Sequence, residues 1–197
     1  MKKKIGLIIV LLVLVVLTGG CLNKKESKTN KETTEKKDYG ELVEITYSDS
    51  GDMNGNIDAI TIDVVESTMK KEYSTGINEP IAVTVYNVKR EEIEKLAETI
   101  IKYDLPSLSD LPLDEEMMPL DASTPILTFT YDKEGKYGRD TWYSINFYTK
   151  IPDKKREILN ELVKSIRDLE DSGVIVNKYT EDRNWWFIND KKLEWKR

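Results

Sequence analysis

The stretch ELVEITYSDSGDMNGNIDAITIDVVE, residues 41–66, alternates polar and apolar side chains on either side of a polar centre. Segments 41–48 and 57–66 are also rich in β-branched residues, and this combination is typical of strands with one buried face. Between them, the pair Asn54-Gly55 can supply the positive φ angles that a tight hairpin turn requires. The stretch therefore predicts two antiparallel strands.

The same alternation recurs further along the chain and predicts three more strands, over residues 81–88, 125–132 and 141–149. Apolar residues at intervals of three and four predict two amphipathic helices, over residues 90–105 and 153–169. Residues 105–125 contain four prolines and predict a long acidic loop. Because strands are grouped with strands and each helix needs one covered face, we predict an α+β fold. It would be a mainly antiparallel sheet with two amphipathic helices packed on one face.

The first twenty residues have the pattern of a signal peptide. Three lysines precede an apolar run over residues 5–17, and small residues follow it. That run has 13 residues, whereas a helix that crosses the hydrocarbon of a bilayer needs about 20. We therefore expect residues 1–20 to be removed rather than to remain as a membrane-spanning helix.

The segment from Leu17 to Cys21, LTGGC, resembles the lipobox of bacterial lipoprotein precursors. The resemblance implies that the thiol of Cys21 receives a diacylglycerol and that cleavage makes this residue the mature N-terminus. It also implies a location at the outer face of the cell membrane, with the lipid as the anchor. The alternative is a cleaved secretory signal followed by an incidental cysteine.

Residues 21–38 contain almost no apolar side chains after the cysteine, and we expect them to be a flexible charged tether. Residues 39–197 then form a single α+β domain with a net charge of −11. A domain this acidic lacks the basic surface of a nucleic-acid binder, so we expect no nucleic-acid partner. Its field would attract a cation or a basic partner, although the acidic residues could also serve solubility alone.

The turn between the first two strands partly overlays a calcium-binding loop. Asp52, Asn54 and Asp58 fall at positions that carry ligands in such loops, but the first and last carboxylates of the pattern are missing. A weak calcium site and an ordinary polar hairpin turn are both compatible with this pattern, and we assign no metal ligand.

The chain contains no histidine, which removes the most common general base near neutral pH and most zinc sites. A hydrolase that works on envelope material through two carboxylates remains an alternative, because such enzymes need only two acids at a set separation. No pair stands out by its spacing, so we assign no catalytic residue and no cofactor, and we expect binding rather than catalysis.

The C-terminal stretch holds Trp185, Trp186 and Trp195, three of the four tryptophans. They could stack on a cell-wall sugar or anchor a partner protein, or they could close the core as part of a terminal hairpin. The domain resembles uncharacterised lipoproteins of Gram-positive bacteria, which implies no activity. We therefore expect a membrane-anchored, extracytoplasmic, non-catalytic binding or interaction module.

Overall fold

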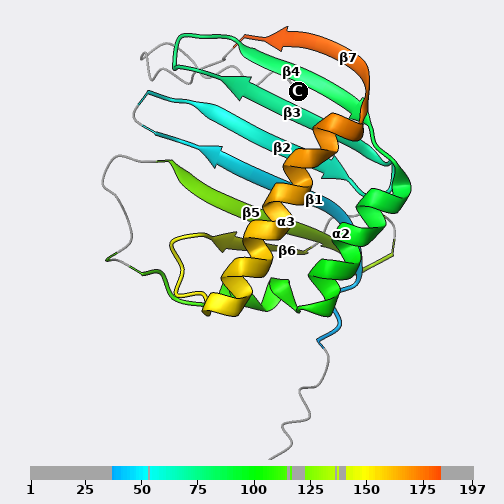
Figure 1. Ribbon diagram of the computed structural model, residues 1–197, viewed down its shortest axis with the longest axis vertical. Helices are drawn as coiled ribbons and strands as arrows, with labels where there is room; N and C mark the ends of the chain where they lie inside the picture. Colours follow the sequence, from blue (N-terminus) through cyan, green and yellow to red (C-terminus); the bar gives the residue numbers. More distant parts are fainter. Residues whose placement is uncertain are drawn as a thin grey trace, which may run out of the picture. The chain divides into compact units, whose positions relative to one another are not determined.

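The computed structural model describes residues 37–182 except 53, 115, 117–122, 136 and 138–140. Contacts divide the chain into two compact units, residues 1–37 and 38–197, and every described helix and strand belongs to the second. The described residues form a mixed α+β structure that is dominated by one seven-stranded antiparallel sheet (Figure 1).

The strand order in the sheet is β6-β5-β1-β2-β3-β4-β7, and every neighbouring pair is antiparallel. The strands are β1 (Glu41–Ser50), β2 (Ile57–Asp63), β3 (Thr68–Ser74), β4 (Ile81–Asn87), β5 (Thr124–Asp132), β6 (Thr141–Asn146) and β7 (Val174–Glu181). The prediction of a mainly antiparallel sheet is confirmed. Strand β1 lies inside the sheet because it pairs with both β2 and the much later β5.

Strand β1 pairs with β2 as predicted and Gly55 has a φ of +71°, but residues 51–56 join the two strands in place of the expected tight turn at Asn54-Gly55. The amide of Gly55 donates to the carbonyl of Asp52 at 2.9 Å. The second strand, however, is shorter than the predicted 57–66. The carboxylate of Asp63 accepts hydrogen bonds from the amides of Val65 and Glu66, at 3.0 and 2.8 Å, and this turn ends β2 and leads into β3.

Strand β3 was not predicted from the sequence, and neither was β7, which adds to the sheet beside β4. All eight of its residues are exposed, among them Val174 and Val176. An edge strand without a buried face has no need to alternate polar and apolar side chains, so the periodicity that marks the other strands is missing.

Two α-helices and one 3-10 helix accompany the sheet in the described part of the chain: α2 (Arg90–Lys102), η1 (Leu105–Asp110) and α3 (Asp153–Ser172). The 3-10 helix over residues 105–110 thus corrects the first part of the prediction of a long loop over residues 105–125. Pro106 lies in the first turn of η1, where its missing amide costs no intrahelical hydrogen bond. Among the described residues, no helix is long and apolar enough to cross a membrane.

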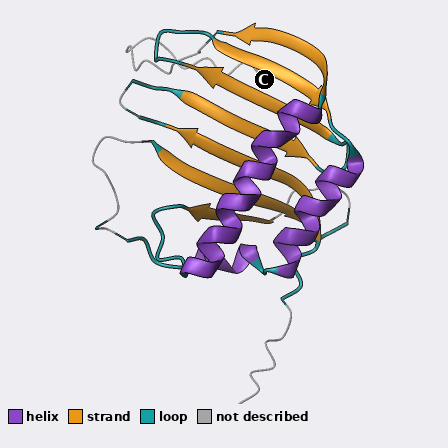
Figure 2. Ribbon diagram, viewed as in Figure 1, coloured by secondary structure: helices purple, strands orange, loops and turns teal. Residues whose placement is uncertain are grey.

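One continuous core joins the helices to the sheet. It includes Ile45, Phe129 and Ile145 from the sheet, Ile100 from α2 and Leu159 from α3, each with 0% exposure. Helix α3 crosses several strands, as its contacts with side chains of β1, β2, β3 and β4 show. Helix α2 lies beside α3 (Figure 2).

The chain approaches β1 through a tightly held junction at Tyr39 and Gly40. The ring of Tyr39 lies 5.5 Å from that of Tyr131 and 5.1 Å from that of Tyr143, and its hydroxyl donates to Asp104 at 2.6 Å. Burial and this carboxylate raise the pKa of Tyr39 far above its usual value. Gly40 has a φ of +89°, and a Cβ there would lie 2.5 Å from the carbonyl oxygen of Asp132. Only glycine fits this approach without a shift of backbone.

Candidate binding groove between α2 and α3

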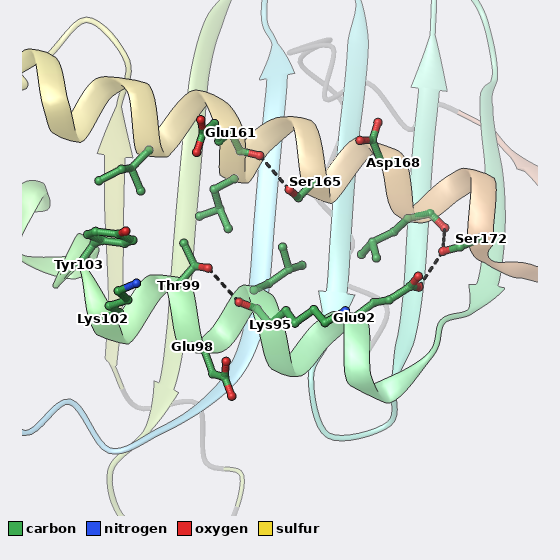
Figure 3. A pocket seen from close by; sticks show the side chains of 14 residues that line it. Glu92, Lys95, Glu98, Thr99, Lys102, Tyr103, Glu161, Ser165, Asp168 and Ser172 are labelled. Carbon is green, nitrogen blue, oxygen red and sulfur yellow. Dashed lines mark hydrogen bonds between the residues drawn. The ribbon is translucent and has the colours of Figure 1, made fainter.

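A groove of about 520 Å³ lies on the surface between α2 and α3 (Figure 3). Its floor is apolar and is formed by Leu96 of α2 and by Ile158, Leu162 and Leu169 of α3. These side chains belong to the buried stripes that hold each helix to the core or pack against that core. The groove therefore exists because two amphipathic helices lie side by side, with shorter or polar residues along their shared border.

The two ends of the groove differ in chemistry. At one end, the hydroxyl of Ser172, in the last turn of α3, donates to the carboxylate of Glu92, in the first turn of α2, at 2.7 Å. At the other end, the ammonium of Lys102 lies 5.0 Å from the centre of the Tyr103 ring. The helices are thus antiparallel, and the groove runs from an acidic end to a basic, aromatic one (Figure 3).

The hydroxyl groups along the groove already have partners within their own helices. Thr99 donates to the carbonyl of Lys95 at 2.9 Å, and Ser165 donates to the carbonyl of Glu161 at 2.9 Å (Figure 3). Because these donors are occupied, the groove offers a partner mainly apolar contact along its floor and charge along its borders.

The acids bordering the groove outnumber the bases, since Glu92, Glu98, Glu161 and Asp168 face only two lysines. Among the described residues, Glu98, Glu161 and Asp168 take part in no ion pair. In Figure 3 none of these three carboxylates points into the space between the two helices. A partner lying in the groove would therefore meet apolar atoms beneath it and unpaired negative charge beside it.

A separate group of charges ties α3 to the sheet. The carboxylate of Glu170 accepts hydrogen bonds from the ammonium of Lys71 on β3 and from the hydroxyl of Tyr86 on β4, the latter at 3.0 Å. The hydrogen bond from Lys71 lowers the pKa of Glu170, and burial raises the pKa of Tyr86. Arg167 donates to Asp58 at 2.9 Å, with its guanidinium 5.1 Å from the ring centre of Tyr47. These groups are satisfied and position the helix.

The residues of the possible calcium loop are held in different structural roles. Both carboxylate oxygens of Asp52 accept hydrogen bonds from Asn56: one from its backbone amide, at 2.9 Å, and the other from its side-chain amide. Asp58 instead lies in β2 and pairs with Arg167. Asn54 lies in the turn between β1 and β2. No group of three or more metal-ligating side chains occurs within the described ranges.

The other candidates from the sequence lie outside the described residues. This holds for the lipidation site Cys21 and for the three C-terminal tryptophans Trp185, Trp186 and Trp195. The groove could not be predicted from the sequence. The only available signal was the presence of two amphipathic helices, and periodicity cannot show which helices become neighbours.

Comparisons with known proteins return no relative for this chain: no family model, no curated protein and no solved structure matches it. The fold and the groove define the chain as an acidic α+β domain with a surface cleft between two helices. Its function must therefore be argued from these residues.

Proposed function

We propose that this chain is a lipoprotein that is anchored at the outer face of the cell membrane through Cys21 and acts as a non-catalytic binding module. The support for the anchor is the lipobox-like segment after an apolar run that is too short to span a bilayer. Two acyl chains on one cysteine give stable attachment, at roughly 0.8 kcal/mol for each buried methylene.

We further propose that the groove between α2 and α3 is the binding site and that its occupant is a basic, amphipathic segment of a partner protein. The observation that carries this proposal is the coincidence of an apolar floor with unpaired carboxylates along its borders. A helical segment with lysines on one side and leucines on the other would satisfy both features, as in other helix-in-groove complexes.

The arrangement that creates this groove is also part of the proposal, namely that α2 and α3 pack on the same face of the sheet. The side chains of Ile93 and Ile100 from α2 share a core cluster with Ile62 and Met69 from the sheet and with Leu162 from α3. A common core is the expected result when two amphipathic helices cover one sheet face.

The anchor can be tested in a bacterial host that lipidates exported proteins. The chain should incorporate a labelled palmitate and partition into detergent, and the variant Cys21→Ser should do neither, because the sequence contains no other cysteine. Equal labelling of the variant would show that the lipid, if any, is attached elsewhere.

The groove can be tested with residues 38–197 and a fluorescently labelled helical peptide of leucine and lysine, with a leucine–glutamate peptide as the charge control. Reversal of Glu161 and Asp168 to lysine should weaken binding of the basic peptide by about fivefold per charge, since each pair contributes about 1 kcal/mol. The matched control is Glu134→Lys, at an exposed loop residue outside the groove. If Glu134→Lys weakened peptide binding by the same factor, the loss would follow from the net charge of the domain, and this would contradict a binding site in the groove.

A further inference from the structure

Four neighbouring strands, β6, β5, β1 and β2, carry a row of hydroxyl side chains across the sheet. Each member of the row pairs directly with the next: Ser144, Thr128, Thr46 and Thr61. Paired residues of antiparallel strands point to the same side of a sheet. The chain neighbours of Thr46 are Ile45 and Tyr47, and both belong to the core cluster. Because side chains alternate along a strand, the hydroxyl row faces away from this core.

The hydroxyl row is open to solvent and carries no charge. Ser144 is exposed, and the three threonines are partly exposed. At about 4.8 Å between strands, the row spans about 14 Å. It ends at Lys70 of β3, which pairs with Thr61 and whose ammonium lies 3.1 Å from the carboxylate of Glu72. A ligand on this row would therefore meet hydroxyl groups rather than an unbalanced charge.

An exposed indole stands beside the hydroxyl row. Trp142 of β6 lies two residues before Ser144, so it points to the same side of the sheet, and it is 67% exposed. Tryptophan is highly buried on average, and it is enriched where proteins bind partners. An indole this exposed, next to polar side chains, therefore offers a ligand a large apolar surface.

A small cavity lies on the same side of the sheet, at the far end of the next row. Trp142 begins this row, and Thr130, Glu44 and Asp63 continue it across the registers. Asp63 borders a cavity of about 230 Å³. The other residues that line this cavity are Val43, Val65, Glu66 and Tyr137. Tyr137 is 57% exposed, so an exposed aromatic ring lies at each end of this surface.

We propose that this surface binds a neutral glycan chain, with Trp142 stacked on one sugar ring. A sugar ring has an apolar face, which matches an indole, and a rim of hydroxyl groups. Serine and threonine hydroxyls can each donate one hydrogen bond and accept others, so the row can pair with that rim. The bond of 2.9 Å between Thr128 and Ser144 leaves part of this capacity in use and part of it available.

Charge selects a neutral glycan over an anionic one. Residues 39–197 carry a net charge of −11, so an anionic polymer would be repelled. At the other end of the surface, the ring of Tyr137 and the carboxylate of Glu66 supply a second stacking face and a hydrogen-bond acceptor. None of these residues lines the groove between α2 and α3, so the inference stands independently of the groove.

Calorimetry with residues 38–197 and two neutral hexasaccharides, of N-acetylglucosamine and of glucose, tests the proposal. At least one should bind, and Trp142→Ala should weaken its binding by about tenfold. The double variant Thr46→Val and Thr61→Val keeps the β-branched shape and should cost about fivefold for each lost hydrogen bond. The hexasaccharide of galacturonic acid, which is anionic, should bind at least about tenfold more weakly than the neutral sugar.

Two matched controls lie on the α3 side of the sheet. Tyr73, 51% exposed, pairs with Asp58, which contacts Arg167 of α3. Thr84 pairs with Lys71, which contacts α3 as well. Neither Tyr73→Ala nor Thr84→Val should change sugar binding, because both side chains point away from the proposed surface.

Three results would overturn the proposal. The first is that neither neutral sugar binds, and the second is that Tyr73→Ala weakens binding as much as Trp142→Ala. The third is a change in the sedimentation of the sugar-free domain on Trp142→Ala, because a second copy of the chain would then cover this surface. Trp142→Phe keeps an aromatic face and should retain most of the binding. A loss equal to that of Trp142→Ala, at an unchanged urea midpoint, would contradict stacking.

Discussion

Substitution of Gly40 by alanine should destabilise the domain by two separable effects. A non-glycine residue at a φ of +89° stores about 1–2 kcal/mol of backbone strain. The added Cβ would also lie 2.5 Å from the carbonyl oxygen and 3.0 Å from the carbonyl carbon of Asp132. These are backbone atoms of β5, which is paired with β1 at this point, so they cannot move aside as a flexible side chain would. Overpacking of this kind costs about 1–3 kcal/mol more.

The chain offers a matched control in Gly51. This glycine has a similar φ of +95°, but a Cβ there would meet nothing within 4 Å. Gly51→Ala should therefore show the strain alone, about 1–2 kcal/mol, and Gly40→Ala should show the sum, about 2–5 kcal/mol.

Urea unfolding of residues 38–197, monitored by circular dichroism, measures the free energy of unfolding of both variants. In thermal unfolding, Tm should fall by about 2–4 °C for each kcal/mol of lost stability. If the two variants agree within about 0.5 kcal/mol, then the junction is not pressed against Asp132 and the reasoning fails. A native-like stability for Gly40→Ala alone would be stronger evidence against it.

Three further outcomes are expected in the same assay. Phe129→Ala should cost about 3–5 kcal/mol because the ring is 0% exposed, whereas Ile101→Ala, at a 50% exposed position, should cost less than about 1 kcal/mol. Tyr131→Phe should be neutral or stabilising, since its buried hydroxyl has no hydrogen-bond partner among the described residues, while Tyr86→Phe should cost about 1–2 kcal/mol through the lost bond to Glu170. Because the pKa of Glu170 is lowered in the folded state, its contribution is present above its ordinary pKa and is lost as pH falls through the acid range. The stabilities of the native chain and of Glu170→Gln should therefore converge in acid, and a constant difference would refute this.

The local parts of the fold could be predicted because their causes are local. Gly55 supplies the positive φ of the connection between β1 and β2 by its backbone freedom, and the apolar stripes of α2 and α3 need no knowledge of what they face. The end of β2 was missed for an equally local reason. Valines continue the strand pattern past Asp63, but the carboxylate of that residue competes by accepting hydrogen bonds from the amides of Val65 and Glu66.

The parts that could not be predicted depend on pairings across long stretches of sequence. Strand β7 lies beside β4, and β5 lies beside β1, yet neither pairing has a sequence signal of its own. The contact between Lys71 and Glu170 joins residues 99 positions apart. The groove has the same origin, since its two walls come from helices that are separated by the whole of β5 and β6. A single sequence shows which surfaces are apolar, but not which of them meet.

The acidic residues of the domain fall into two groups that differ in whether a basic side chain pairs with them. Glu170 and Asp58 are neutralised by Lys71 and Arg167 where α3 meets the sheet, so their charge serves the fold. The groove acids, of which Glu161 is one, have no such partner within the described part of the chain. Like charges that gather unpaired at a surface slightly destabilise a domain. Their reversal should therefore leave folding intact, and a loss of peptide binding in those variants can be attributed to the groove itself.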